Sequence, residues 1–141
     1  MSKWAPHLVG LATPLSAIIC LMVGGWWMLL PIILLLGIYP ILDTLGGSTT
    51  VHDVEEEGKG HDFIVHLHGI FVPLVVLALM FRIWDGIGSI SIVIPILSAG
   101  LATGAAGVVA AHELGHRKPK SFSWWLGRLD LFSVLYLHFT V

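Results

Sequence analysis

The residues best suited to chemistry form the run His112-Glu113-Leu114-Gly115-His116, near the end of a long apolar stretch. Residues four apart lie on one face of a helix, so the two imidazoles can bind one metal ion or face a pair of ions. Imidazole nitrogen is a ligand for zinc, iron, copper and nickel. The alternative is a pair of interfacial histidines that hydrogen-bond to other helices. Because the pair brackets a glutamate beside small residues in an apolar chain, we favour His112 and His116 as metal ligands.

Other titratable residues lie at the ends of neighbouring apolar segments. Asp43 ends the second segment, whereas His66 and His68 open the third, where at most one of them should point inward. Ionisable groups at membrane depth are costly and are therefore candidates for function. A metal-bound histidine commonly donates its second N–H to a carboxylate or carbonyl, so we expect Asp43, Glu113 and one of these histidines beside the ligand pair. A packing or interfacial role is an equally good interpretation of each residue taken singly.

The composition defines the environment that must position these residues. Of the 141 residues, 56% are hydrophobic and 11% are charged, and the mean hydropathy is +0.90. Soluble domains carry about 25% charged residues and disordered chains are poor in apolar ones, which excludes both classes. With 7 basic and 9 acidic residues and no basic stripe, the chain is not expected to bind nucleic acid. The single cysteine, Cys20, excludes an internal disulfide framework and a multi-cysteine zinc site. With these classes excluded, the composition indicates an integral membrane protein.

We predict an all-α integral membrane bundle of about four spanning helices plus a partial fifth, built as one domain over residues 1–141. A spanning helix needs roughly 20 mostly apolar residues. Four segments have this character: Leu8–Val23, Trp26–Leu42, Phe63–Trp84 and Ile87–Ala111. A fifth, Trp124–Val141, is apolar but contains Arg128, Asp130 and His138, so it is predicted to lie at the interface or to cross halfway.

The short connections further define the arrangement. Gly24-Gly25 predicts a tight hairpin between the first two spans, and the polar stretch Gly46–Asp62 predicts a solvated acidic connector. Basic residues favour the cytoplasmic side of short loops. If the N-terminus is cytoplasmic, only Arg82 lies on the opposite side of the membrane. Six basic residues then lie on the cytoplasmic side: Lys3, Lys59, Arg117, Lys118, Lys120 and Arg128. We therefore predict a cytoplasmic N-terminus. Gly100-x-x-x-Gly104 predicts close packing of the ligand-bearing helix in the bundle centre, with a dimer interface as the alternative.

The run from His112 to Lys118 resembles the first histidine box of the membrane alkane monooxygenases, which reads H-E-L-G-H-K. These enzymes belong to the wider membrane fatty-acid-desaturase and hydroxylase group. Pro40-Ile41-Leu42-Asp43 resembles the P-L-L-D that ends their second span, and Leu137-His138-Phe139 resembles the G-H-F before their second box. The similarity extends over most of the chain, and its specific part is the first box.

The resemblance implies six spanning helices in a bacterial-type cell (inner) membrane and two non-haem irons held by histidines, among them His112 and His116. It also implies that the terminal methyl of an alkane is hydroxylated with O2 and with electrons from rubredoxin. The chemistry suits an apolar bundle, because an unactivated C–H bond offers no charge to bind and the metal must supply the reactivity.

Three further motifs of that family do not occur in this sequence. They are the second box, of the form E-H-x-x-G-H-H, the third box, and the stretch N-Y-x-E-H-Y-G. Two box histidines cannot hold two irons. We therefore expect the chain to be the N-terminal part of such an enzyme, truncated relative to the six-helix family, and to be inactive alone.

The same residues also match the zinc-protease pattern H-E-x-x-H over positions 112–116. In an intramembrane metalloprotease both histidines would bind zinc and Glu113 would be the general base. The third ligand would then have to be Asp130 or His138, and the residues around the pair fit the hydroxylase box better. A xylene-type monooxygenase, a desaturase and a small membrane protein with a structural histidine pair are the remaining alternatives.

Overall fold

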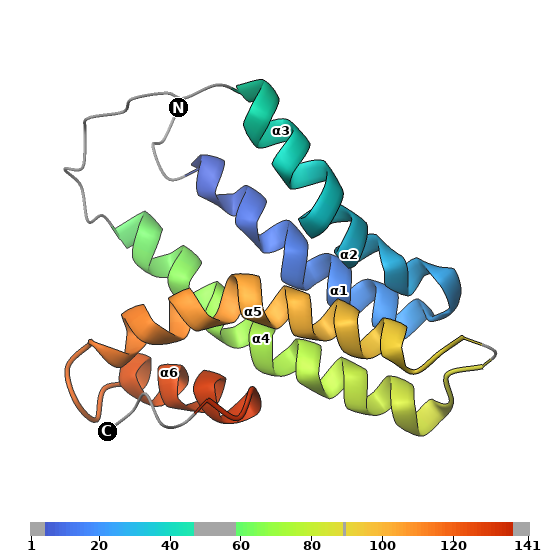
Figure 1. Cartoon of the computed structure of the whole chain (residues 1–141). Coiled ribbons are helices and arrows are strands. Elements are labelled where there is room, and N and C mark those ends of the chain that lie inside the picture. Colours follow the sequence, from blue (N-terminus) through green and yellow to red (C-terminus); the bar gives the residue numbers. More distant parts are fainter. Residues whose placement is uncertain (1–4, 47–58, 89, 137–141) are drawn as a thin grey trace.

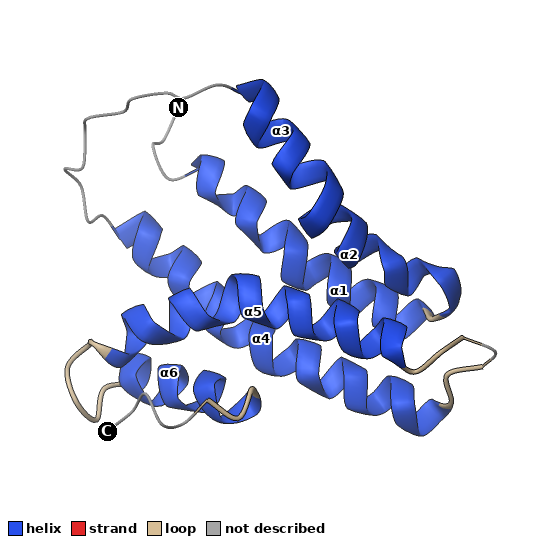
Figure 2. Ribbon diagram, viewed as in Figure 1, coloured by secondary structure: helices blue, strands red, loops and turns tan. Residues whose placement is uncertain are grey.

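The described residues of the chain fold mainly into helices. A computed structural model describes residues 5–46, 59–88 and 90–136, and no strand occurs within these ranges (Figure 2). This confirms the predicted all-α class. The elements in chain order are η1 (Ala5–Leu11), α1 (Ala12–Val23), η2 (Gly25–Leu29), α2 (Leu30–Ile33), η3 (Leu34–Ile38), α3 (Tyr39–Gly46), α4 (Lys59–Asp85), α5 (Val93–Gly115) and α6 (Phe122–Ser133).

Three helical stretches are long and apolar enough to cross a membrane. They are Gly25–Gly46, which runs continuously from η2 to α3, Gly60–Asp85 within α4, and Val93–Gly115, which is α5. The shortest has 22 residues, which gives about 33 Å of helix against a hydrocarbon core of about 30 Å. The described chain therefore contains the helices of a multi-pass membrane protein.

The first and last predicted segments are shorter than a full span. Leu8–Val23 is a shorter apolar helix, and α6 has 12 residues, or about 18 Å of helix. Leu135, with φ of 59°, follows α6 and turns the chain away from the helix axis. Residues 137–141, the end of the fifth predicted segment, lie outside the described residues. The described chain thus has three helices of spanning length where the sequence predicts about four.

The turn between α1 and η2 is as tight as the sequence predicts. Gly24 and Gly25 have φ of 77° and 62°, and the Gly24 N–H donates to the Cys20 carbonyl at 2.9 Å. Glycine adopts this left-handed conformation without the steric cost that a Cβ adds. A Cβ on Gly24 would also overlap the guanidinium of Arg82, which lies against the turn from α4. The hairpin therefore depends on glycine for both backbone and space.

Gly24→Ala is expected to lower the free energy of unfolding by about 1–3 kcal/mol, because the new Cβ meets both a left-handed backbone and Arg82. Thermal unfolding of the detergent-solubilised chain, followed by circular dichroism, measures the loss. The matched control is Gly100→Ala, a helical position with open space around it. An equal loss in the two variants would contradict this account of the turn.

The fourth predicted segment starts later than its hydropathy indicates. The sequence predicts a start at Ile87, whereas α5 begins at Val93. Gly86 and Gly88 have φ of 100° and 70°, a conformation outside the helical region, so the apolar residues around them form a loop. Pro95 then lies in the first turn of α5, where a missing N–H removes no helical hydrogen bond.

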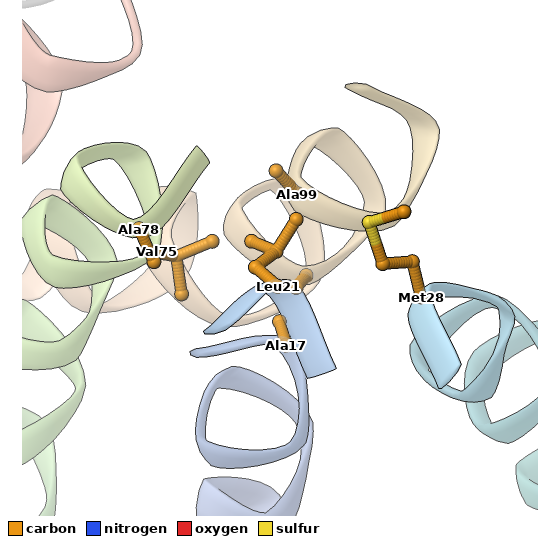
Figure 3. Close-up of a cluster of buried hydrophobic side chains, with 7 residues drawn as sticks. Ala17, Leu21, Met28, Val75, Ala78 and Ala99 are labelled. Carbon is orange, nitrogen blue, oxygen red and sulfur yellow. The ribbon is translucent and has the colours of Figure 1, made fainter. Parts of the chain in front are cut away.

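A cluster of buried apolar side chains joins α1, η2, α4 and α5 (Figure 3). Leu21 of α1 lies between the helices that carry Val75 and Ala99, and Met28 reaches the cluster from η2. Leu21, Met28 and Val75 are completely buried. The small α5 residues in this cluster let the larger side chains of α1 and α4 pack close to the α5 backbone.

The buried face of α5 differs from the one that the glycine spacing predicts. Ala102, Ala106 and Gly107 are buried, and a Cβ on Gly107 would lie 2.8 Å from Val72 of α4. Gly100 and Gly104 are instead exposed, with no described neighbour within 4 Å of an added Cβ. Because α5 packs against α1, α4 and α6, its central position is confirmed. The prediction that Gly100 and Gly104 form its packed face is wrong within the described residues.

The helices alternate in direction, which places several polar ends on one side of the fold. In Figure 1 the start of η1, the end of α3, the start of α4 and the end of α5 lie towards the left and top. The α1–η2 turn and the α4–α5 loop lie towards the right. The end of α3 is splayed well away from the end of α5, whereas the start of α4 lies closer to it.

Candidate metal centre

The two predicted ligands lie together at the end of α5. His112 belongs to its last full turn, and His116 caps the helix with its N–H donating to the His112 carbonyl at 3.3 Å. The Nε2 atoms of the two rings are 3.0 Å apart, the ring centroids 4.5 Å apart, and the rings are nearly perpendicular. Both side chains are exposed. The helical spacing thus brings the two imidazoles together as predicted.

This spacing suits two ligands of one metal ion. A zinc–imidazole bond is about 2.0–2.1 Å, and two such bonds at the tetrahedral angle put the nitrogens about 3.4 Å apart, a few tenths of an ångström more than the 3.0 Å between these Nε2 atoms. A direct hydrogen bond between one protonated and one unprotonated Nε2 gives the observed separation. The donor set therefore fits a single ion at this position. Among the described residues, no group of three or more His, Cys, Asp or Glu side chains is placed to hold a metal.

Glu113 is engaged away from the ring pair. Its Oε1 accepts from Arg117 Nη2 at 3.0 Å, and the same Nη2 donates to Asp62 Oδ1 of α4 at 2.6 Å. Arg117 therefore bridges the start of α4 and the end of α5. The three side chains are between a third and a half exposed, so each ion pair contributes at most about 1 kcal/mol. The position of Glu113 is that of a structural ion-pair partner.

His66 lies on the α6 side of α4. Its Nδ1 is 2.6 Å from the Asp62 carbonyl, and its Nε2 is 2.8 Å from Ser123 Oγ of α6. Since a carbonyl only accepts, Nδ1 carries the proton and Nε2 accepts from the serine hydroxyl. The ring also stacks on Phe122 with a centroid distance of 6.2 Å. His66 therefore attaches α6 to α4.

His68 and Asp43 lie apart from the ring pair. The His68 ring bonds to the Ile64 carbonyl at 3.0 Å and faces Gly10 of η1, on a different side of α4 from His66. Asp43 is exposed near the end of α3, the end that is splayed away from α5 in Figure 1. Among the described residues, none of the four expected partners of the pair, which are Asp43, His66, His68 and Glu113, hydrogen-bonds to either ring.

Helix α6 packs against α5 beside the histidines because of a glycine. A Cβ on Gly127 would lie 2.9 Å from Leu114 Cβ and 3.0 Å from both the Ala111 carbonyl oxygen and the Gly115 nitrogen. Only a residue without a side chain allows two helix backbones to approach this closely. Ser121 starts α6 as an N-cap, since its hydroxyl accepts from the Trp124 N–H at 3.2 Å.

A cavity of about 520 Å³ lies between α5 and α6. His112 and His116 form part of its wall from α5, and Trp124 and Arg128 form part from α6. The other lining residues are mainly apolar: Val108, Val109, Ala111, Gly115, Gly127, Leu131 and Tyr136. The ring pair therefore borders a space of the size and composition that binds small organic ligands.

Asp130 is the most unusual charged residue in the described chain. It is 1% exposed, and neither carboxylate oxygen has a hydrogen-bond partner among the described residues. Burial raises its pKa to about 8, so it is largely protonated at neutral pH. Asp130, one of the two possible third ligands in the zinc-protease alternative, is thus buried away from solvent. The other candidate for that role, His138, lies outside the described residues.

Sequence reasoning missed the roles of Gly127 and Arg128, which line the cavity, and of Ser123, which joins α6 to α4. A glycine one helical turn before a buried aspartate is the only local signal for the α5–α6 contact. The serine and the arginine gain their roles from contacts with other residues of α4 and α6. The chain matches no family model, and comparison with curated proteins and with solved structures finds no similar protein.

Proposed function

We propose that this chain contributes to a non-haem diiron monooxygenase that hydroxylates the terminal methyl of alkanes. One observation carries the proposal: two exposed imidazoles, with Nε2 atoms 3.0 Å apart, end a helix of spanning length beside a mainly apolar cavity. The resemblance of the run from His112 to Lys118 to the first box of the alkane monooxygenases supports it. A metal beside an apolar space is the arrangement that oxidation of a hydrocarbon requires.

In this proposal His112 and His116 hold iron, which when bound supplies the O2 chemistry that no side chain provides. The cavity walls contribute binding. Val108, Val109 and Leu131 would cover an apolar chain and contribute van der Waals contacts. Gly127 keeps α6 against α5, and the Ser123 contact with His66 holds α6 against α4, so that this wall stays beside the histidines. The remaining ligands of a diiron centre would come from outside the described residues.

The proposal includes a membrane orientation and an electron donor. The start of η1 and the end of α5 lie on the same side of the fold (Figure 1), so a cytoplasmic N-terminus in a bacterial-type cell would place the end of α5 on the cytoplasmic side of the inner membrane. The exposure of both rings suits the approach of a soluble reductant, for which rubredoxin is the donor implied by the resemblance. Exchange of alkane with the bilayer suits the apolar helices that surround the cavity.

Metal analysis tests the ligand role directly. The purified chain, loaded anaerobically with Fe(II) and then desalted, is expected to hold at most one weakly bound iron and to show no octane hydroxylation. Either His112→Ala or His116→Ala should abolish that iron binding, because a single imidazole at an exposed site holds iron poorly. His68→Gln is the matched control, since His68 faces η1 and should leave the iron content unchanged.

The outcomes separate the competing functions. Two tightly held irons per chain would refute the expectation that the chain is incomplete. Unchanged iron in the doubly substituted His112→Ala/His116→Ala chain would remove the proposed ligands and favour a structural pair. O2-independent peptidase activity with zinc, abolished by Glu113→Gln, would replace the oxygenase with the metalloprotease.

A further inference from the structure

We propose that Ser123 and His66 form a nucleophile–base pair that hydrolyses carboxylic esters with an apolar acyl group. The inference goes beyond the proposed function, because this chemistry needs no metal and uses neither His112 nor His116. It rests on three observations: the geometry of the pair, the position of Ser123 in the first turn of α6, and the exposed aromatic ring beside the pair.

The Ser123 hydroxyl is placed to give its proton to His66. Ser123 Oγ lies 2.8 Å from His66 Nε2, and the Nδ1–H of the same ring donates to the Asp62 carbonyl at 2.6 Å. That carbonyl fixes the tautomer in which Nε2 can accept a proton, a role that the aspartate has in a Ser-His-Asp triad. A base within hydrogen-bond reach activates a serine hydroxyl as a nucleophile. Both side chains are partly exposed, so a substrate can approach the hydroxyl.

The start of α6 supplies hydrogen-bond donors beside the nucleophile. Ser123 is the second residue of the helix, and Ser121 accepts from the Trp124 N–H as its N-cap. The N–H groups of Phe122 and Ser123 belong to the first turn, where a helix provides no acceptor of its own. Because helical side chains lean towards the N-terminus, Ser123 Oγ lies on the side of these amides. The positive end of the helix there favours the oxyanion that forms when the hydroxyl attacks a carbonyl.

An exposed aromatic ring lies against the pair. Phe122 stacks on the His66 ring with a centroid distance of 6.2 Å and an angle of 3° between the planes. Its side chain is 70% exposed. A phenyl face adjacent to the nucleophile offers an apolar surface to the acyl group of an ester. The arrangement therefore favours esters of apolar acids.

The reaction is a hydrolysis in two steps. Ser123 Oγ bonds to the acyl carbon as its proton passes to His66 Nε2, and the bond to the alcohol oxygen breaks as that oxygen takes the proton from Nε2. Water then bonds to the acyl carbon and gives a proton to Nε2. The bond between the acyl carbon and Oγ breaks, and Oγ takes the proton back. One ester and one water become one acid and one alcohol, with no change of oxidation state.

Covalent labelling of the detergent-solubilised chain tests the nucleophile. An alkyl fluorophosphonate bonds to an activated serine oxygen through phosphorus and releases fluoride, and peptide mass spectrometry locates the label. With EDTA present, we expect Ser123 to be labelled at least about tenfold faster than Ser121 and Ser133, since an adjacent base activates the hydroxyl. Ser133 donates to the Asp130 carbonyl at 2.7 Å instead of to an imidazole. Comparison of serines within one molecule does not depend on the fraction of folded chain.

Variants then test the base and the turnover of p-nitrophenyl butyrate. His66→Gln keeps a side chain that can hydrogen-bond to Ser123 but cannot take its proton, so labelling and hydrolysis should slow by about 10²-fold or more. Ser123→Ala should remove the label at this position and lower hydrolysis by at least as much. The matched controls are Ser133→Ala and His68→Gln, and both should retain the wild-type rates. His68 bonds to the Ile64 carbonyl as His66 does to that of Asp62, but it faces Gly10.

Two results would overturn the inference. Labelling of Ser123 no faster than that of Ser133 would show that the hydroxyl is not activated, and the pair would then only attach α6 to α4. Hydrolysis that persists unchanged in Ser123→Ala would assign the reaction to another group. Neither result depends on iron, so failure here and failure of the proposed monooxygenase are distinguishable.

Discussion

Gly127→Val is expected to detach α6 from α5 and to lower the free energy of unfolding by about 3 kcal/mol. An added Cβ would already lie 2.9 Å from Leu114 Cβ and 3.0 Å from the backbone atoms of Ala111 and Gly115. Backbone atoms of a packed helix cannot move aside as a flexible side chain can. The two branches of valine increase the overlap, so the helices must separate, and the cavity beside His116 is lost with their contact.

Two measurements follow this detachment. Thermal unfolding in detergent can be monitored by tryptophan fluorescence, because α6 carries Trp124 and Trp125. Amide hydrogen exchange over residues 122–133 should become faster, because the amides of a detached helix open more often. Gly104→Val introduces the same side chain on α5 where nothing lies within 4 Å of an added Cβ, and it should leave stability nearly unchanged, because valine is no poorer a helix former than glycine. Similar losses in both variants would contradict the tight contact at Gly127.

Asp130→Asn is expected to abolish a strong pH dependence of stability. Burial raises the Asp130 pKa from its ordinary value of 3.8 to about 8 in the folded chain. Between these two values the folded state holds a proton that the unfolded state releases, so stability is highest below pH 4 and falls as pH rises towards 8. At 1.36 kcal/mol for each unit of difference, the loss is on the order of 5 kcal/mol.

The comparison of wild type and variant isolates this group. The wild-type melting temperature should fall between pH 5 and pH 8, whereas Asp130→Asn should show a much smaller change and exceed the wild type at pH 8. The other titratable groups are common to both proteins, so their contribution cancels in the difference. Parallel curves for the two proteins would mean that Asp130 is solvated or paired in solution.

The fold was predictable from sequence where local physical rules decide it. A run of apolar residues long enough for the bilayer must be helical, because no other open structure satisfies its backbone there. The Gly24-Gly25 pair between two such runs likewise predicts a tight turn. The prediction was less accurate where hydropathy and backbone conformation disagree. Ile87 is apolar, but the neighbouring glycines Gly86 and Gly88 keep the chain out of the helix before Val93.

The site was predictable only within one helix. His112 and His116 are brought together by the helical repeat alone, so their spacing in the sequence was sufficient. Their relation to Asp43 depends on how α3 lies against α5, which no local pattern defines. The cavity likewise requires that α6 cross α5 at Gly127, a contact between residues more than ten positions apart. The hydropathy pattern does not predict long-range contacts of this kind.

The Arg117 bridge marks the register of α4 against α5 at the end of the fold that carries the histidines. One guanidinium joins Asp62, near the start of α4, to Glu113, near the end of α5. At these points the antiparallel helices α4 and α5 end on the same side of the apolar region. If α4 slid along α5 by a single helical turn, about 5.4 Å, the bridge would break. An intact bridge therefore reports the packed register of the two helices, and sliding of α4 that moved the histidines relative to the start of α4 would show first as loss of the Arg117 contacts.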